Sequence, residues 1–184
     1  MHAALHTTGM NILVTGASGF VGKALCNALS NDGYTINAAV RSEEQAFPLV
    51  KNTSYCLVGG IDKDTDWSSV VYGVDSIVHL AARVHVMHDI ASDPLSAFRP
   101  VNVAGTERLA RQASAAGVRR FIYLSSVKVN GEESPVFYTE KSTPDPQDAY
   151  AVSKWEAEQI LHQVASATGM EVLLSDHRLS MVLV

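Results

Sequence analysis

Residues 11–22 read Asn-Ile-Leu-Val-Thr-Gly-Ala-Ser-Gly-Phe-Val-Gly, a short apolar run followed by a glycine at every third position. The apolar run predicts a strand, and the amphipathic stretch that begins at Phe20 predicts a helix. A glycine turn between a strand and a helix is typical of a cradle for dinucleotide phosphates, because the free amides and the positive dipole of the helix N-terminus attract anions. The segment therefore predicts a dinucleotide-binding protein.

The glycines of this turn have separate expected roles. Gly16 permits the tight turn, Gly19 lets the backbone approach the pyrophosphate, and Gly22 lets the helix pack on the strand. The alternative is a glycine turn with only a structural role. If the turn is a cradle, the expected cofactor contacts are Gly16, Ser18, Gly19, Phe20, Val21 and Gly22.

Short apolar runs alternate with longer amphipathic ones along the rest of the chain. Strands are expected over 12–14, 34–40, 55–58, 76–80, 121–125 and 171–174, and helices over 20–31, 67–72, 93–116 and 148–168. Apolar strands separated by helices predict an α/β fold, a doubly wound parallel sheet with helices on both faces. Ligands bind such sheets at the carboxyl ends of the strands, so these ends are where a site is expected.

Tyr150 and Lys154 are four residues apart on a predicted helix and therefore share a face. A phenol is a poor base at neutral pH, but a nearby ammonium and the positive nicotinamide ring would lower its pKa and make proton transfer feasible. Ser125 and Ser126 follow the fifth predicted strand and add a hydroxyl that could hold a substrate oxygen. The alternative is an accidental Tyr-Lys pair on an exposed helix.

The residues after the second and fourth predicted strands bear on the cofactor. Arg41 and Ser42 end the second strand, where an acidic residue would bind ribose hydroxyls. A cation and a hydroxyl suit a 2′-phosphate instead, so NADP is favoured over NAD; the alternative is a solvated surface arginine. Leu80 ends the fourth strand, and the small side chains of Ala81 and Ala82 after it would let the backbone lie close to the cofactor; all three are expected cofactor contacts.

Composition narrows the classes of partner and location. The 184 residues are 47% hydrophobic with a formal net charge of -5, which argues against nucleic acid and anionic membrane as partners. Cys26 and Cys56 lack zinc-site spacing and favour a reducing, cytoplasmic location. His85 and His88 are close in sequence but lack a third ligand, so no metal site is expected.

Five motifs in order resemble the extended short-chain dehydrogenase/reductase family of NAD(P)-dependent sugar-nucleotide epimerases and dehydratases. They are Thr-Gly-Ala-Ser-Gly-Phe-Val-Gly (15–22), His-Leu-Ala-Ala (79–82), Asn-Val-x-Gly-Thr (102–106), Leu-Ser-Ser-Val (124–127) and Tyr-x-x-Ser-Lys (150–154). The resemblance implies that Tyr150 is the acid/base, that Lys154 holds the nicotinamide ribose and tunes Tyr150, that Ser126 orients the substrate and that Asn102 supports the site.

The stretches around 79–87 and 127–132 look most similar to bacterial 4-epimerases or 4-ketoreductases of surface-polysaccharide pathways. The implied substrate is a UDP- or dTDP-sugar, and a homodimer is expected for an intact homologue. One departure concerns the adenine: the family often has Gly-Asp after the third strand, whereas this chain has Gly59-Gly60 with Asp62 slightly later. Two other functions remain open, a non-catalytic nucleotide-binding fragment and a reductase of non-sugar ketones.

The expected organisation is an N-terminal extension over 1–9, a dinucleotide-binding domain over 10–174 and an aberrant tail over 175–184. The family runs on through Arg-Pro-x-x-Val-Tyr-Gly-Pro-Gly into a substrate domain. The string CGACCACCGCTTGTCTATGGTCCTGGT encodes such a motif, and when started one base later it encodes Asp-His-Arg-Leu-Ser-Met-Val-Leu-Val, the sequence of 176–184. The tail therefore predicts a reading-frame shift near Ser175 and a missing substrate domain; the alternative is a short natural strand.

Overall fold

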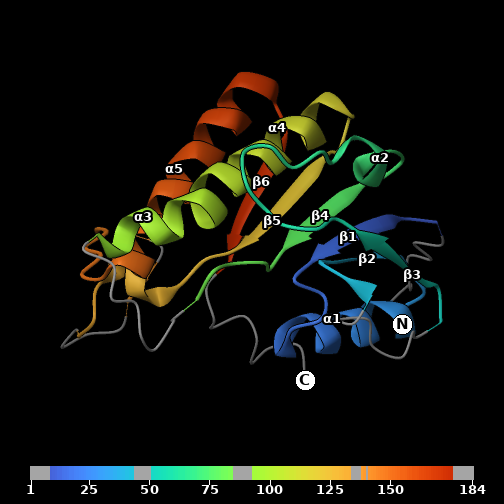
Figure 1. Cartoon of the computed structure of the whole chain (residues 1–184), viewed down its shortest axis with the longest axis horizontal. Helices are drawn as coiled ribbons and strands as arrows, with labels where there is room; N and C mark the ends of the chain where they lie inside the picture. Colours follow the sequence, from blue (N-terminus) through green and yellow to red (C-terminus); the bar gives the residue numbers. More distant parts are fainter. Residues whose placement is uncertain (1–8, 44–50, 85–92, 134–137, 140, 176–184) are drawn as a thin grey trace, which may run out of the picture.

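A computed structural model describes residues 9–43, 51–84, 93–133, 138–139 and 141–175. Within these residues the strands form one parallel sheet in the order β3-β2-β1-β4-β5-β6 (Figure 1). The strands are β1 (Asn11–Thr15), β2 (Thr35–Val40), β3 (Thr53–Leu57), β4 (Ser76–His79), β5 (Arg120–Leu124) and β6 (Glu171–Ser175). The helices are α1 (Phe20–Asn31), α2 (Ser68–Val71), α3 (Pro94–Arg99), α4 (Thr106–Ala115) and α5 (Ala149–Thr168). The prediction of a doubly wound parallel α/β sheet is confirmed.

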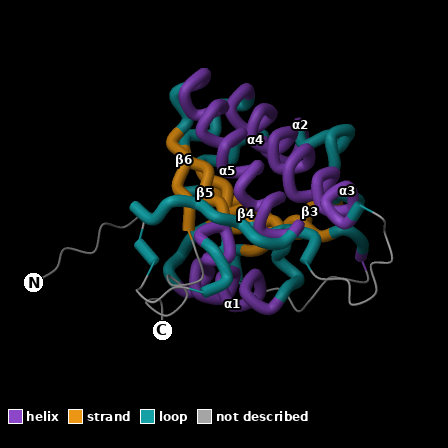
Figure 2. The backbone as a smooth tube through the Cα atoms, turned by 90° about the vertical axis from the view of Figure 1, so that its left-hand side faces the viewer, coloured by secondary structure: helices purple, strands orange, loops and turns teal. Residues whose placement is uncertain are grey.

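The helices lie on both faces of the sheet. In the described residues, α1 covers one face, while α2, α4 and α5 cover the other (Figures 1 and 2). Side chains alternate between the two cores, as the two-residue period of a strand requires. Ile12 and Val14 pack toward α1, whereas Leu13 packs with Trp67 and Leu161 on the opposite face.

The carboxyl ends of β1, β4 and β5 lie side by side. Thr15 at the end of β1 is in register with His79 at the end of β4, and His79 is in register with Tyr123 of β5. The chain turns from β1 toward β2 on one side, and from β4 toward β5 on the other. This switch in direction is where ligands bind in doubly wound sheets, and the glycine turn begins directly after Thr15.

The long helix predicted over 93–116 is helical from Pro94 to Ala115, but its middle is a π-helical turn. Asp93 caps the start of α3 by accepting hydrogen bonds from the backbone of Leu95 and Ser96. A π-helical turn, η2 (Pro100–Gly105), then separates α3 from α4. Proline has no N–H to donate, so the hydrogen-bond pattern of the helix must change near Pro100. Turns of this kind occur frequently at functional sites, and Asn102 is buried within it.

Several sequence expectations fall on residues outside the described ranges. They concern the extension over 1–8, the residues His85 and His88, and the tail over 176–184, so the domain boundaries stay a prediction. Ser175 is the last residue of β6. Within the described ranges, no group of three or more His, Cys, Asp or Glu is arranged to hold a metal ion. In those same ranges, no helix combines the length and the apolar character needed to span a membrane.

Candidate active site

The glycine turn after β1 has no room for side chains. Gly16 adopts a φ of +67°, and a Cβ there would lie 2.8 Å from the backbone nitrogen of Ala81. A Cβ on Gly22 would lie 2.2 Å from the carbonyl oxygen of Gly16. The first glycine therefore lets β1 approach the segment after β4, and the last lets α1 close over the turn. Gly19 precedes the helix and donates its N–H to the Gly16 carbonyl oxygen at 3.0 Å.

The N-terminus of α1 offers donors for an anion. The first N–H groups of a helix have no intrahelical acceptor, and here they belong to Phe20, Val21 and Gly22. Among the described residues no side chain caps this end, and the first turn holds no acidic residue. The side chain of Phe20 is 94% exposed beside the turn, and Ser18 is half-buried. Backbone donors, a positive helix dipole and a turn of small residues fit a dinucleotide pyrophosphate.

A buried hydrogen-bond chain fixes the segment after β4. The N–H of Ala81 donates to Thr15 Oγ1 at 3.2 Å, and this oxygen lies 2.6 Å from His79 Nδ1. The other ring nitrogen, Nε2, lies 3.0 Å from Thr106 Oγ1 on α4. Each threonine hydroxyl can donate or accept, so the neutral ring connects Thr15 to Thr106 in either tautomer. Burial, with the charge of Lys154, lowers the pKa of His79 to about 3, so the ring is neutral.

The sequence motif His-Leu-Ala-Ala was noted, but the role of its histidine was missed. Leu80, Ala81 and Ala82 are half-buried at the end of β4 beside Gly16, where the cofactor is expected. His79 holds these residues to β1 and α4 through neutral hydrogen bonds. Its partners, Thr15 and Thr106, are distant in sequence, so only the folded chain reveals the connection.

Tyr150 and Lys154 lie on α5 as predicted, but their electrostatics differ from the expectation. Lys154 is 2% exposed, and its ammonium lies 4.1 Å from the centroid of the Tyr123 ring. Burial lowers the pKa of Lys154 to about 7, an effect that Glu158 opposes. Burial, followed by the charge of Asp148, raises the pKa of Tyr150. In the protein without cofactor, desolvation thus decides the direction of the Tyr150 pKa shift, and the lowering expected from the ammonium and the nicotinamide ring together stays a prediction.

Asn102 joins the segment after β4 to α5. Its Nδ2 donates to the Arg83 carbonyl oxygen at 3.0 Å and to Ser153 Oγ at 2.9 Å, while its Oδ1 accepts the Arg83 N–H at 2.7 Å. Ser153 in turn donates to the Tyr150 carbonyl oxygen at 2.7 Å. The structure thus brings Asn102 and Tyr150 together through Ser153. The Tyr-x-x-Ser-Lys motif included this serine, but the sequence did not indicate its role.

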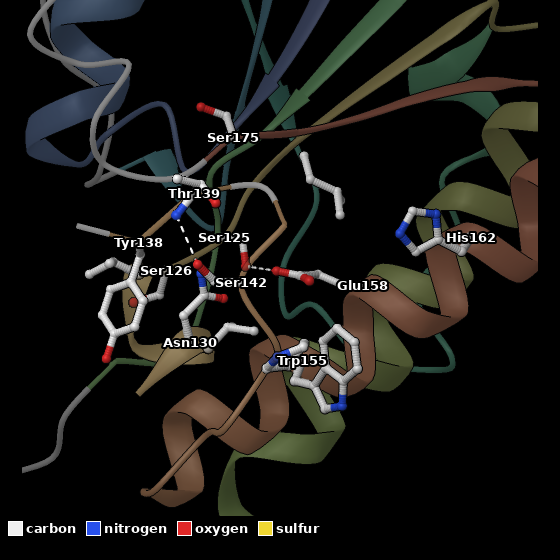
Figure 3. Close-up of a pocket in the computed structure, with 14 residues that line it drawn as sticks. Ser125, Ser126, Asn130, Tyr138, Thr139, Ser142, Trp155, Glu158, His162 and Ser175 are labelled. Atoms are coloured by element: carbon white, nitrogen blue, oxygen red, sulfur yellow. Dashed lines mark hydrogen bonds between the residues drawn. The ribbon is translucent and has the colours of Figure 1, made fainter. Parts of the chain in front are cut away.

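The two serines after β5 have different partners. Ser126 accepts a hydrogen bond from the Lys128 N–H at 3.3 Å and begins a 3-10 turn, η3 (Val127–Asn130). Ser125 donates its hydroxyl to the carboxylate of Glu158 on α5. Both serines line a cavity of about 660 Å³ between the end of β5, α5 and the segment that contains Tyr138 (Figure 3). Tyr150 and Lys154 are not among the residues that line this cavity.

The residues expected near the adenosine lie at the other end of the site. Arg41 follows β2 directly and is exposed, at the strand end next to the glycine turn. Asp62, the late acidic residue after β3, accepts hydrogen bonds from the Asp64 N–H and from Thr65 Oγ1. The Asp62 carboxylate therefore stabilises its own turn.

Comparison with known proteins agrees with this geometry. The model of the NAD dependent epimerase/dehydratase family matches residues 12–175. A UDP-glucose 4-epimerase of Vibrio cholerae is 41% identical over 169 residues, which are 89% of this chain and 50% of that protein. A 4-hydroxy-2-methyl-3-oxo-4-farnesyl-3,4-dihydroquinoline-1-oxide ketoreductase of Stigmatella aurantiaca is 30% identical over 157 residues, or 84% and 46% of the two chains.

A solved structure shares the fold. UDP-glucuronic acid 4-epimerase from Bacillus cereus, in complex with UDP-glucuronic acid and NAD, superimposes with a TM-score of 0.77 at 26% identity. The match covers 90% of this chain and 55% of that one. The chain thus spans about half the length of the curated relatives it matches.

Proposed function

Because the chain belongs to the NAD dependent epimerase/dehydratase family, we propose that it carries the cofactor-binding and proton-transfer residues of an NAD(P)-dependent nucleotide-sugar 4-epimerase or 4-ketoreductase. The proposed substrate is a UDP- or dTDP-sugar that serves surface-polysaccharide synthesis. The name of the Vibrio cholerae relative, a UDP-glucose 4-epimerase, supports chemistry at C4. A cytoplasmic location and a homodimeric assembly stay predictions.

One observation carries the proposal: the glycine cradle and the Tyr150-Lys154 pair meet at the same edge of the sheet. Gly16 lies against Ala81 after β4, and Asn102 ties Arg83, two residues further on, to Ser153 on α5. A continuous set of contacts, through the backbone at Gly16 and Ala81 and through the side chains of Asn102 and Ser153, thus runs from the phosphate cradle to the turn of α5 that bears Tyr150. This arrangement supports a cofactor held across the strand ends with its reactive part near Tyr150.

Tyr150, Lys154 and Ser126 have separate proposed roles in proton transfer, charge stabilisation and substrate orientation. When bound, the nicotinamide supplies the hydride acceptor and donor for C4 of the sugar. Tyr150 would take the proton of the 4-hydroxyl group as the ketone forms, and would return it as the alcohol is restored. Lys154, charged, would stabilise the phenolate and bind the ribose hydroxyls. Ser126 would donate a hydrogen bond to the substrate oxygen.

The choice between the two dinucleotides belongs to the same proposal. We infer a preference for NADP from Arg41 and Ser42, because a cation and a hydroxyl suit a 2′-phosphate. NAD is the dinucleotide named in the solved Bacillus cereus complex. The preference for NADP rests on this chain's own residues after β2, and Arg41→Ala tests it by its effect on the affinity for each dinucleotide.

The test of the function pairs turnover with cofactor binding. The 184-residue chain is assayed with a panel of UDP- and dTDP-sugars and both cofactors, and dinucleotide binding is measured by calorimetry. Tyr150→Phe should abolish turnover, because it removes the phenolic hydroxyl group that transfers the proton. Cofactor affinity should stay within about threefold, because the ring and nearly all of its volume remain. Tyr72→Phe is the matched control, since Tyr72 is 86% exposed. Full activity of Tyr150→Phe would exclude the proposed role.

Two other functions have specific support. The Stigmatella aurantiaca relative is named a ketoreductase of a quinoline oxide, which favours a reductase of non-sugar ketones as the second candidate. The chain spans about half of its relatives, and contacts remote from the reacting atom contribute to catalysis; a nucleotide-binding fragment without turnover is therefore the third. Adding non-sugar ketones with NADH or NADPH to the panel distinguishes the three functions. Turnover of a nucleotide sugar supports the first, turnover of a non-sugar ketone supports the second, and dinucleotide binding without turnover supports the third.

A further inference from the structure

Lys154 and Glu158 lie one turn apart on the buried side of α5. Glu158 is 8% exposed and Lys154 is 2% exposed, and residues four apart on a helix are neighbours. A buried ammonium pays a large desolvation cost unless an opposite charge is close. Around Lys154 the described structure provides an aromatic ring, that of Tyr123, and a neutral imidazole, that of His79. Glu158 is the carboxylate whose charge favours the protonated lysine.

The carboxylate of Glu158 is held in place from the sheet. Ser125 donates its hydroxyl to Glu158 Oε1, and the Ser125 N–H donates to the Ser175 carbonyl oxygen at 2.6 Å. The end of β5 is thereby tied both to β6 and to α5. Figure 3 shows Glu158 extending from α5 toward Ser125, with His162 one turn further along the helix. A carboxylate anchored by a neighbouring strand keeps one position relative to the lysine.

The surroundings of this carboxylate are mixed. Glu158 lies one helical turn from the buried lysine, and it also lines the cavity of about 660 Å³. Burial raises the pKa of Glu158, whereas Ser125, His162 and Lys154 lower it. Within the described residues, the titratable and polar groups around the pair are Tyr150 and His162 from α5, Tyr123 from β5, Ser125 directly after β5, and His79 from β4.

We propose that Glu158, anchored by Ser125, is a positioning residue that keeps the buried Lys154 protonated for its part in the proposed reaction. Without it, desolvation would leave Lys154 neutral, and a neutral amine would neither stabilise the phenolate of Tyr150 nor attract the ribose hydroxyls as an ammonium does. The proposal rests on the proposed function for its purpose, but the charge coupling is a property of the folded chain alone.

The direct test is the titration of Lys154 by side-chain NMR on the 184-residue chain, with the signal assigned by its loss in Lys154→Met. The wild-type midpoint is expected at a pH of about 7. Glu158→Gln, which keeps an acceptor for Ser125, should lower this midpoint by roughly 1 to 3 pH units. Glu158→Asp should restore part of the shift. An unchanged or higher midpoint in Glu158→Gln would overturn the proposal.

The control variant is Glu156→Gln on the same helix, whose carboxylate pairs with Arg99 at the surface. It should leave the Lys154 midpoint unchanged. If Glu158→Gln does not fold, Ser125→Ala takes its place: loss of the hydrogen bond makes the carboxylate easier to protonate, so the Lys154 midpoint should fall by a smaller amount. An unmoved midpoint in Ser125→Ala would then count against the proposal.

Cofactor affinity gives a second readout that a purely structural role would not move. The affinity for NAD should weaken as pH rises through the Lys154 midpoint, and in Glu158→Gln this break should shift to lower pH by the same amount. The two proposals fail separately. A chain that turns over no sugar but shows the shifted titration contradicts the function, whereas an active chain with an unmoved titration contradicts the role of Glu158.

Discussion

Asn102 Nδ2 donates a hydrogen bond to Ser153 Oγ at 2.9 Å and thereby connects a π-helical turn to the helix that bears Tyr150. Both side chains are buried, so loss of this hydrogen bond would leave polar atoms without a partner, at a cost in free energy of folding. The same amide also accepts the Arg83 N–H and donates to the Arg83 carbonyl oxygen. The side chain of Asn102 therefore connects the segment after β4 to the start of α5.

Removing this amide should destabilise the protein and disturb the site together. Asn102→Ala should lower the free energy of unfolding by about 1 to 3 kcal/mol, because it leaves the Arg83 N–H without its buried acceptor. Ser153→Ala should cost about 1 kcal/mol. The double variant should cost less than the sum, since both singles break one shared bond. Urea unfolding of the four proteins measures the coupling, and exposed Asn31→Ala is the control. Strictly additive losses would contradict a shared network.

Gly22→Ala tests the closure of α1 over the glycine turn. Alanine in a helix is normally favoured over glycine by about 1 kcal/mol. Here the new Cβ would lie 2.2 Å from the Gly16 carbonyl oxygen and 2.7 Å from Ala17 Cα, and these backbone atoms must move. Overpacking of this kind costs about 1 to 3 kcal/mol, so the net change should be destabilising and dinucleotide affinity should fall.

The matched control for this substitution is Gly60→Ala. A Cβ on Gly60 meets nothing within 4 Å, and the residue has no positive φ. Its unfolding free energy and its dinucleotide affinity should both remain near the wild-type values. A Gly22→Ala variant that melts higher than wild type and binds cofactor equally well would show that the turn is not tightly packed.

His79 should make stability depend on pH in a defined direction. Burial lowers its pKa from 6.5 to about 3, so the unfolded chain binds a proton that the folded protein excludes. The contribution of the neutral, buried imidazole to the free energy of unfolding is fully present above pH 6.5 and is lost as pH falls toward 3. His79→Gln should be less stable than wild type at neutral pH, because buried hydrogen bonds weaken, but the difference should narrow as the solution is acidified.

Urea unfolding at pH values from about 7.5 down to about 4.5 measures this difference. Using the difference between two proteins cancels the shared contribution of the carboxylates. Exposed Asn31, which does not titrate, provides the control, and Asn31→Ala should follow the wild-type pH curve at a constant offset. A constant gap between wild type and His79→Gln would mean that the imidazole is not held neutral by burial.

Arg41→Ala tests the preference for NADP. If the guanidinium binds a 2′-phosphate, the variant should bind NADP roughly tenfold more weakly, the lower end expected for an exposed charge-assisted hydrogen bond. NAD affinity should not change. The shift in melting temperature with each dinucleotide provides the measurement. Arg120→Ala, at the amino end of β5, should affect neither. Equal affinity of the wild-type chain for both dinucleotides would contradict the preference.

Local sequence signals were sufficient for the elements that build the site. The bounds of α1, 20–31, were predicted exactly because a glycine turn and an Asp-Gly stop define a helix within a few residues. The alternation of apolar runs predicted the parallel sheet, since only strands buried on both faces need such runs. The spacing of Tyr150 and Lys154 placed them on one helix by periodicity alone.

The tertiary structure decided what depends on burial and on partners distant in the chain. Thr15 and His79 are 64 residues apart, Asn102 and Ser153 are 51 apart, and Ser125 and Glu158 are 33 apart. No sequence period connects such pairs, because each arises where strand ends and helices meet. The same holds for the pKa of Tyr150, which burial raises in the protein without cofactor: the sequence shows which charges are near in the chain, but desolvation is set by what the folded protein packs around the phenol.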